Sequence, residues 1–126
     1  RNCRNSLGII NPYLGGYMMD WGPEIDVRML GEARDGSLAH ALLDVREPRE
    51  VEICAIAGSL FIPMQQIPVR LAELPREHPL IIMCHHGSRS DTVAQFLRGN
   101  GFSNIHNLAG GIDAWAALME PGMPRY

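Results

Sequence analysis

The segment Cys84-His85-His86-Gly87-Ser88-Arg89-Ser90 places a nucleophilic side chain among groups that attract an anion. It contains no proline, so every residue after the cysteine offers a backbone N–H group. Backbone N–H groups that begin a helix or curl around one point carry partial positive charge and bind anions. Arg89 adds a permanent positive charge, and a thiolate is stabilised in such surroundings. The sequence therefore predicts that Cys84 is an anionic nucleophile.

The residues on either side of this segment predict a strand, a tight turn and a helix. Residues 80–83 are a short apolar run that is typical of a buried strand. Val93, Phe96 and Leu97 have the spacing of one helix face. The cysteine would then lie at the carboxyl end of a strand, where ligands bind in open parallel sheets.

Short apolar runs alternate with helical patterns along the rest of the chain, which predicts an α/β fold. We expect a five-stranded parallel sheet with helices on both faces. The further expected strands are at Ile25, 42–45, 60–62 and 105–108. Two further helices are expected at residues 27–33, capped by Asp26, and from Pro48 onward. A third is expected to begin at Pro68, with Ile67, Leu71 and Leu74 on one face. A fourth is expected after Gly110-Gly111, with Ile112, Trp115, Ala116 and Met119 on one face.

Length and composition limit the function classes. A chain of 126 residues suits one domain. The net charge of −3 argues against nucleic acid as a partner, and no apolar run approaches the roughly 20 residues of a membrane helix. Three widely spaced cysteines, Cys3, Cys54 and Cys84, do not form the pattern of a disulfide framework. A reducing compartment such as the cytoplasm is therefore expected.

The first 22 residues differ from the remainder. Residues 1–22 are rich in glycine, asparagine, aromatic residues and methionine, without periodicity. We interpret them as an N-terminal extension of unknown role, followed by one domain over residues 23–126.

Four separated motifs together resemble the rhodanese family of sulfurtransferases in its single-domain form, over about residues 24–126. The loop that begins with Cys84 is similar to the Cys-His-His-Gly loop of a bacterial subgroup. The motifs are Leu43-Asp44-Val45-Arg46-Glu47, Ile56-Ala57-Gly58-Ser59, the Cys84 segment, and Asn107-Leu108-Ala109-Gly110-Gly111-Ile112-Asp113-Ala114-Trp115.

The resemblance implies a persulfide chemistry without a cofactor. Cys84 would take the outer sulfur of a donor and pass it to a nucleophilic acceptor, each of them a small molecule or a protein. The chain departs from the family at Ala55-Ile56-Ala57-Gly58, where the family often has His-Ile-Pro-Gly. This departure affects a turn rather than the chemistry.

Each residue of the loop also receives an expected role. The substrate-binding candidates are His85, His86, Gly87, Ser88, Arg89 and Ser90. Arg89 is expected to bind an anionic donor, to complete the loop, or both. Asp44 and Arg46 are expected to form a polar clasp under the loop, because a buried charge needs a partner.

Other interpretations of these residues are less favoured. Cys84 as a buried structural cysteine would not explain the loop around it. A metal site at His85 and His86 is not expected, because adjacent side chains diverge and no second cluster has zinc spacing. Cys54 is expected to be a small buried residue rather than a thiol that resolves the persulfide.

Two competing functions belong to other classes. A cysteine-dependent phosphatase or arsenate reductase also uses an amide-lined loop with an arginine. Related phosphatases have five residues between cysteine and arginine, whereas four separate Cys84 from Arg89 here. A phosphatase also needs a general acid, for which Asp91 is the nearest candidate. A non-catalytic binding module should lack the cysteine.

Overall fold

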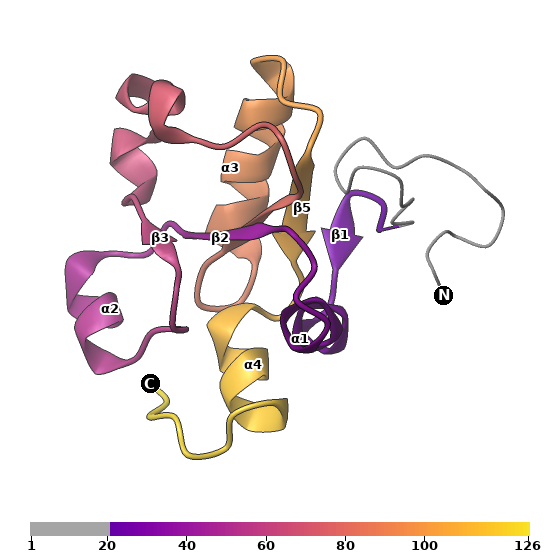
Figure 1. Ribbon diagram of the computed structural model, residues 1–126. Helices are drawn as coiled ribbons and strands as arrows, with labels where there is room; N and C mark the ends of the chain where they lie inside the picture. The colour runs from indigo at the N-terminus through magenta and orange to yellow at the C-terminus, as the bar shows by residue number, and fades with distance from the viewer. Residues whose placement is uncertain (1–20) are drawn as a thin grey trace, which may run out of the picture.

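Five short strands, all parallel, form one sheet at the centre of the protein (Figure 1). The structure is a computed structural model that describes residues 21–126. The sheet order is β1-β5-β4-β2-β3, so β4, which leads to Cys84, has a paired strand on each side. The strands are β1 (Glu24–Ile25), β2 (Ala41–Asp44), β3 (Leu60–Phe61), β4 (Leu80–Met83) and β5 (Ile105–Leu108).

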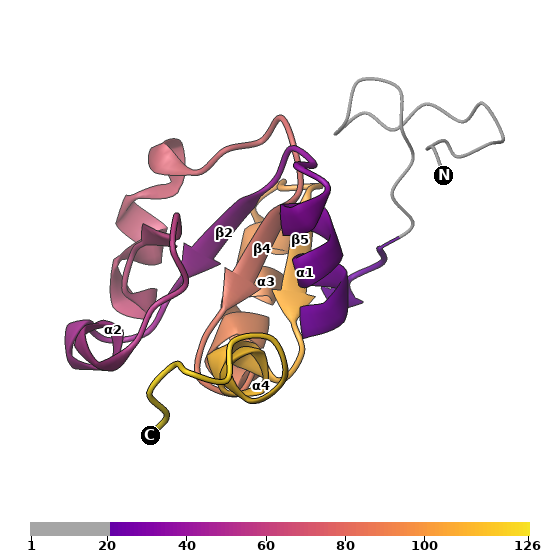
Figure 2. The same ribbon diagram turned by 60° about the horizontal axis from the view of Figure 1, so that its bottom comes forward.

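Helices cover both faces of this sheet (Figure 2). Helices α1 (Val27–Asp35) and α4 (Gly111–Leu118) pack on one face, and α3 (Ser88–Gly99) packs on the other. Successive residues of β4 alternate between the two apolar clusters, because strand side chains point to opposite faces. All four residues of β4 are fully buried. The predicted α/β fold is confirmed.

The helix starts follow the expected local chemistry. The Asp26 side chain accepts a hydrogen bond of 2.9 Å from the Met29 N–H and so caps α1. Helix α2 (Pro48–Ile53) begins at Pro48, where a missing N–H costs nothing. The backbone N–H of Glu47 donates to the Glu50 side chain at 3.0 Å, which is half of a capping box.

The prediction of an α-helix that begins at Pro68 is wrong. Two 3₁₀ helices, η2 (Met64–Val69) and η3 (Leu71–Glu73), occupy this region, and Pro68 lies inside η2. Proline has no N–H to continue an α-helical ladder, so tighter turns are used instead. Ile67 and Leu74 are nevertheless buried, as the apolar spacing indicated.

Two boundaries of the core also differ from the expectations. Met119 is not a core residue: it follows the end of α4 and is 37% exposed. Trp21, inside the expected extension, is buried and meets the His106 ring edge-on at 5.3 Å. The packed core therefore reaches Trp21, whereas the rest of the extension through residue 20 lies outside the described residues.

Candidate active site

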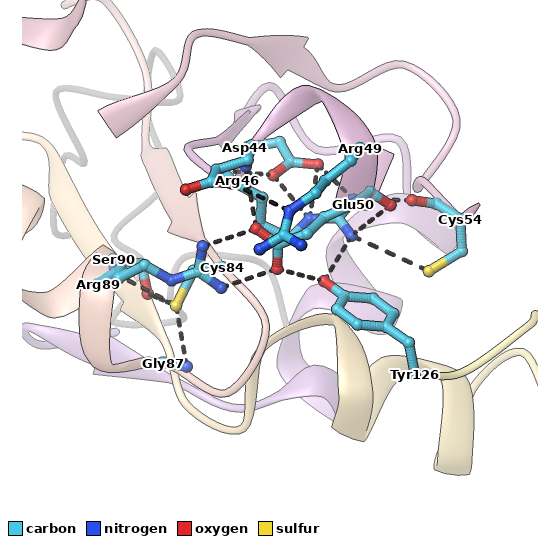
Figure 3. Close-up of polar contacts among 11 residues, drawn as sticks. Asp44, Arg46, Arg49, Glu50, Cys54, Cys84, Gly87, Arg89, Ser90 and Tyr126 are labelled. Carbon is cyan, nitrogen blue, oxygen red and sulfur yellow. Dashed lines mark hydrogen bonds and ion pairs between the residues drawn. The ribbon is translucent and has the colours of Figure 1, made fainter. Parts of the chain in front are cut away.

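Three hydrogen-bond donors surround the sulfur of Cys84 (Figure 3). The backbone N–H of Gly87 lies 3.1 Å from Sγ, and the N–H and hydroxyl of Ser90 each lie 3.3 Å from it. Cys84 is only 1% exposed, so these donors act in surroundings with little competing water. This arrangement stabilises a negative charge on the sulfur.

Gly87 has a backbone conformation that favours glycine. Its φ is +114°, in the region that residues with a Cβ rarely adopt, and it ends the turn at the start of α3. Its carbonyl oxygen accepts from the Asp91 N–H at 3.1 Å and from Asn107 Nδ2 at 3.2 Å. These bonds fix the Gly87–Ser88 peptide unit, which directly follows the N–H group that contacts the sulfur. Asn107 of β5 was not among the expected site residues, because its contact joins distant parts of the chain.

The start of α4 holds the other side of the loop. The N–H groups of Ile112 and Asp113 donate to the carbonyl oxygens of Cys84 and His85 at 2.9 and 3.1 Å. A Cβ on Gly111 would overlap both of those carbonyl oxygens, so glycine is required at this close approach. The loop therefore rests on the backbone of α4, while N–H groups of Gly87 and Ser90 serve the sulfur.

The guanidinium of Arg89 pairs with Glu50 on α2. Arg89 Nη1 and Nη2 lie 2.7 and 2.9 Å from the two carboxylate oxygens, a bidentate ion pair that Figure 3 shows. The hydrogen bonds from Arg89 hold the pKa of Glu50 at about 2, although burial opposes this shift. The same hydrogen bond raises the pKa of Arg89. Sequence reasoning missed Glu50, because it lies 39 positions before Arg89 and no local spacing joins the two.

Asp44 and Arg46 form a second, fully buried ion pair. Arg46 Nη2 lies 2.7 Å from Asp44 Oδ2, and the two side chains are 0% and 1% exposed. Arg46 also donates to the carbonyl oxygens of Glu50 and Cys54 at 3.2 and 2.8 Å. The pair thus binds the end of α2. Its connection to the Cys84 loop runs through Glu50 and Arg89. The expected clasp under the loop is therefore an indirect one, made by way of α2.

Tyr126 joins these two ion pairs. Its hydroxyl donates to Glu50 Oε2 at 2.8 Å and accepts from Arg46 Nη1 at 2.9 Å. Burial raises the pKa of Tyr126 to about 12, so the hydroxyl keeps its proton at neutral pH. No local sequence pattern indicates these contacts, because Tyr126 lies 76 positions after Glu50 and 80 positions after Arg46.

Comparison with known proteins identifies the family. A family model described as a rhodanese-like domain matches residues 27–118. The chain belongs to this family. A sulfurtransferase of Allochromatium vinosum is 36% identical over 93 residues, which are 74% of this chain and 87% of that protein. The crystal structure of a rhodanese-related protein from Thermoplasma volcanium superimposes with a TM-score of 0.68 at 35% identity, over 80% of this chain and 94% of that one.

Some relatives of this rhodanese-like domain are much longer. A rhodanese-like/PpiC domain-containing protein 12 from the chloroplast of Arabidopsis thaliana is 36% identical over 89 residues, and the chain spans only 30% of its length. The family resemblance expected from the four motifs is confirmed. Within residues 21–126, no helix is long and apolar enough to cross a membrane.

The two histidines of the rhodanese loop are in contact with each other. The His85 ring contacts that of His86, with centroids 3.9 Å apart, and burial lowers the pKa of His85. His86 is exposed, with Nδ1 3.9 Å from an Asp113 oxygen. Ser88 is exposed at the first position of α3. Across the described residues, no three histidine, cysteine, aspartate or glutamate side chains are placed to hold a metal ion.

The remaining cysteines are in different surroundings. Cys54 is buried at the end of α2, with its sulfur 4.0 Å from Arg46 Nη1. This placement agrees with the expected structural role. Cys3 lies outside the described residues.

Proposed function

We propose that this rhodanese-like domain is a sulfurtransferase that carries sulfane sulfur as a persulfide on Cys84. The observation that carries the proposal is the set of three donors, from Gly87 and Ser90, around the Cys84 sulfur. The relative from Allochromatium vinosum, which is named a sulfurtransferase, supports it. Candidate donors are thiosulfate and persulfides of small molecules or proteins.

The reaction needs two displacements at sulfur. In the first, the Cys84 thiolate attacks the outer sulfur of the donor, a new S–S bond forms, and the donor's S–S bond breaks. The donor remainder leaves with the electron pair of that bond. In the second, a nucleophilic acceptor attacks the outer sulfur, and Cys84 regains its thiolate. Each step moves negative charge between sulfur atoms, so the site needs anion stabilisation more than an acid and a base.

The rest of the loop supports these steps in our proposal. Gly87 and Ser90 hold the anionic sulfur, and Arg89 fixes the start of α3 against α2. His85, His86 and Ser88 form the rim that a donor or acceptor meets. Asp44 and Arg46 support α2 from below.

The phosphatase alternative receives less support from the geometry. Its leaving group needs a proton from a general acid. Asp91, the nearest candidate, accepts a hydrogen bond of 2.7 Å from Gln95 on the exposed side of α3. A sulfur transfer needs no such acid.

Mass spectrometry after exposure to a sulfane donor tests the proposal. The protein should gain the mass of one sulfur atom and lose it on addition of cyanide. Cys84→Ser should gain none, because a hydroxyl cannot form a persulfide. Cys54→Ser is the matched control and should gain sulfur like the wild type. Sulfur transfer at the wild-type rate by folded Cys84→Ser would refute the proposal.

A further inference from the structure

The positive charge nearest to the Cys84 loop is already neutralised. Both terminal nitrogens of Arg89 are bonded to Glu50, at 2.7 and 2.9 Å. The Glu50 side chain is 10% exposed and that of Arg89 is 36% exposed, so water screens this pair only in part. Its pKa of about 2 keeps the carboxylate charged throughout the working pH range. The Arg89 charge is therefore compensated at close range.

The other arginines near the loop are compensated in the same way. Arg46 pairs with Asp44 at 2.7 Å, and Arg125 pairs with Asp113 at 3.0 Å. The pKa of His85 is lowered by burial, which favours its neutral form at pH 7. Arg46, Arg89 and Arg125 therefore offer no uncompensated guanidinium to an anion that approaches the loop.

This charge balance distinguishes two classes of sulfur donor. Thiosulfate carries two negative charges and must approach a thiolate, so it gains most from a free cation nearby. A small alkyl persulfide, R–S–SH, carries at most one negative charge on its reacting group. We propose that Glu50 is a specificity-determining residue, which neutralises Arg89 and so favours organic persulfides over thiosulfate as donors. The inference rests on the proposed sulfur transfer and concerns its first step.

The favoured first step balances without a further reactant. The Cys84 thiolate attacks the outer sulfur of R–S–SH, and the new Cys84–S bond forms as the donor's S–S bond breaks. The leaving R–S⁻ takes the electron pair of that bond. The proton stays on the transferred sulfur until water accepts it, which leaves the persulfide anion to be held by the loop.

The substitution Glu50→Gln tests this directly. Glutamine has a similar shape and can keep bonds to Tyr126 and to the Glu47 N–H, but it leaves the Arg89 charge uncompensated. We would measure the rate constants for Cys84 persulfidation by thiosulfate and by 2-hydroxyethyl persulfide, at low ionic strength. The expected result is a gain of about tenfold with thiosulfate and less than about twofold with the persulfide.

Two further variants separate charge from shape. Glu52→Gln makes the same charge change at an exposed position of α2 and should alter neither rate by more than about twofold. The double variant Glu50→Gln/Arg89→Gln removes both charges and should return the ratio of the thiosulfate rate to the persulfide rate to within about threefold of the wild-type ratio, whatever happens to the two rates themselves. A tenfold gain that persists in the double variant would show that the shape of the site is responsible, and would overturn the inference.

The remaining outcomes are also decisive. An unchanged ratio of donor rates in folded Glu50→Gln overturns the inference while sulfur transfer itself stands. If Glu50→Gln does not fold, the salt dependence of the wild-type thiosulfate rate tests the inference instead. A rate that falls as salt is added would reveal an uncompensated cation and overturn the inference. A constant or rising rate supports it. If neither donor adds sulfur to the wild type, the proposed function fails.

Discussion

The ring of Tyr126 stacks on the ring of His85, with centroids 3.9 Å apart and planes inclined by 11°. The hydroxyl of the same tyrosine joins Glu50 to Arg46. One side chain thus touches the Cys84 loop through its ring and α2 through its oxygen. The two contacts can be separated by substitution.

Tyr126→Phe should keep the stack and lose the two hydrogen bonds. Glu50 and Arg46 would each lose a partner, so the free energy of unfolding should fall by about 1–2 kcal/mol. Urea denaturation measures this change. Tyr126→Ala, which also removes the ring from His85, should lose more. Equal stabilities of Tyr126→Phe and the wild type would contradict the bridging role of the hydroxyl.

Arg46→Ala should destabilise the protein more than Arg89→Ala does. It leaves Asp44 charged and fully buried without its partner, a change that costs about 3–5 kcal/mol. Arg89 is 36% exposed, so water can hydrate part of the space that it leaves. The loss in free energy of unfolding should therefore be smaller for Arg89→Ala. Thermal unfolding compares the two variants.

Donor kinetics should show the opposite order for the same two variants. Arg89→Ala leaves Glu50 as an uncompensated negative charge near Cys84, so its thiosulfate rate should fall further than that of Arg46→Ala. Reversed orders in both the thermal and the kinetic experiment would mean that the two arginines exchange roles.

Acid should remove the stabilising contribution of Glu50. Its pKa is lowered in the folded protein, so the contribution is complete above the unfolded value of about 4.5 and is lost as the pH falls toward 2. The shift from 4.5 to about 2 corresponds to at most about 3 kcal/mol. Denaturation between pH 6 and 2 measures it, with Glu50→Gln as the reference. A stability difference between the two proteins that does not change with pH would contradict this prediction.

Gly111→Ala should disturb the loop, whereas Gly99→Ala should not. A Cβ at Gly111 would overlap the carbonyl oxygens of Cys84 and His85, and its φ of +60° adds strain of about 1–2 kcal/mol. Gly99, at the end of α3, has open space for a Cβ, with no atom within 4 Å, and Gly99→Ala should gain about 0.5–1 kcal/mol. Thermal unfolding and persulfidation rates together check both variants. Wild-type stability and rate in Gly111→Ala would contradict the close packing of α4 against the loop.

The elements that depend on neighbouring residues were predictable from the sequence. Asp26 caps α1 and Pro48 begins α2 as expected, since both effects act within one turn. The strand before Cys84 was predicted with its observed bounds, because a short, wholly apolar run suits a strand buried on both faces. The exception is Pro68, which favours a helix start but lies within a 3₁₀ helix here.

The parts of the candidate site that depend on tertiary contact were not predictable. Arg89 could be recognised as a cation of the loop, but its partner Glu50 is 39 positions away and no local spacing joins them. The Tyr126 hydroxyl is likewise set by packing. Such contacts decide whether a charge is free or compensated. The sequence alone therefore predicted an anion-binding site but not the net charge of that site.

The central position of β4 has a consequence for how the protein loses activity. Its four residues are fully buried between β5 and β2, so their amide protons should exchange with solvent only through global opening. Cys84 follows directly, and its carbonyl is held by α4. The sulfur proposed to carry the persulfide is therefore attached to the segment that we expect to open last. Heat inactivation of sulfur transfer should then coincide with global unfolding rather than precede it.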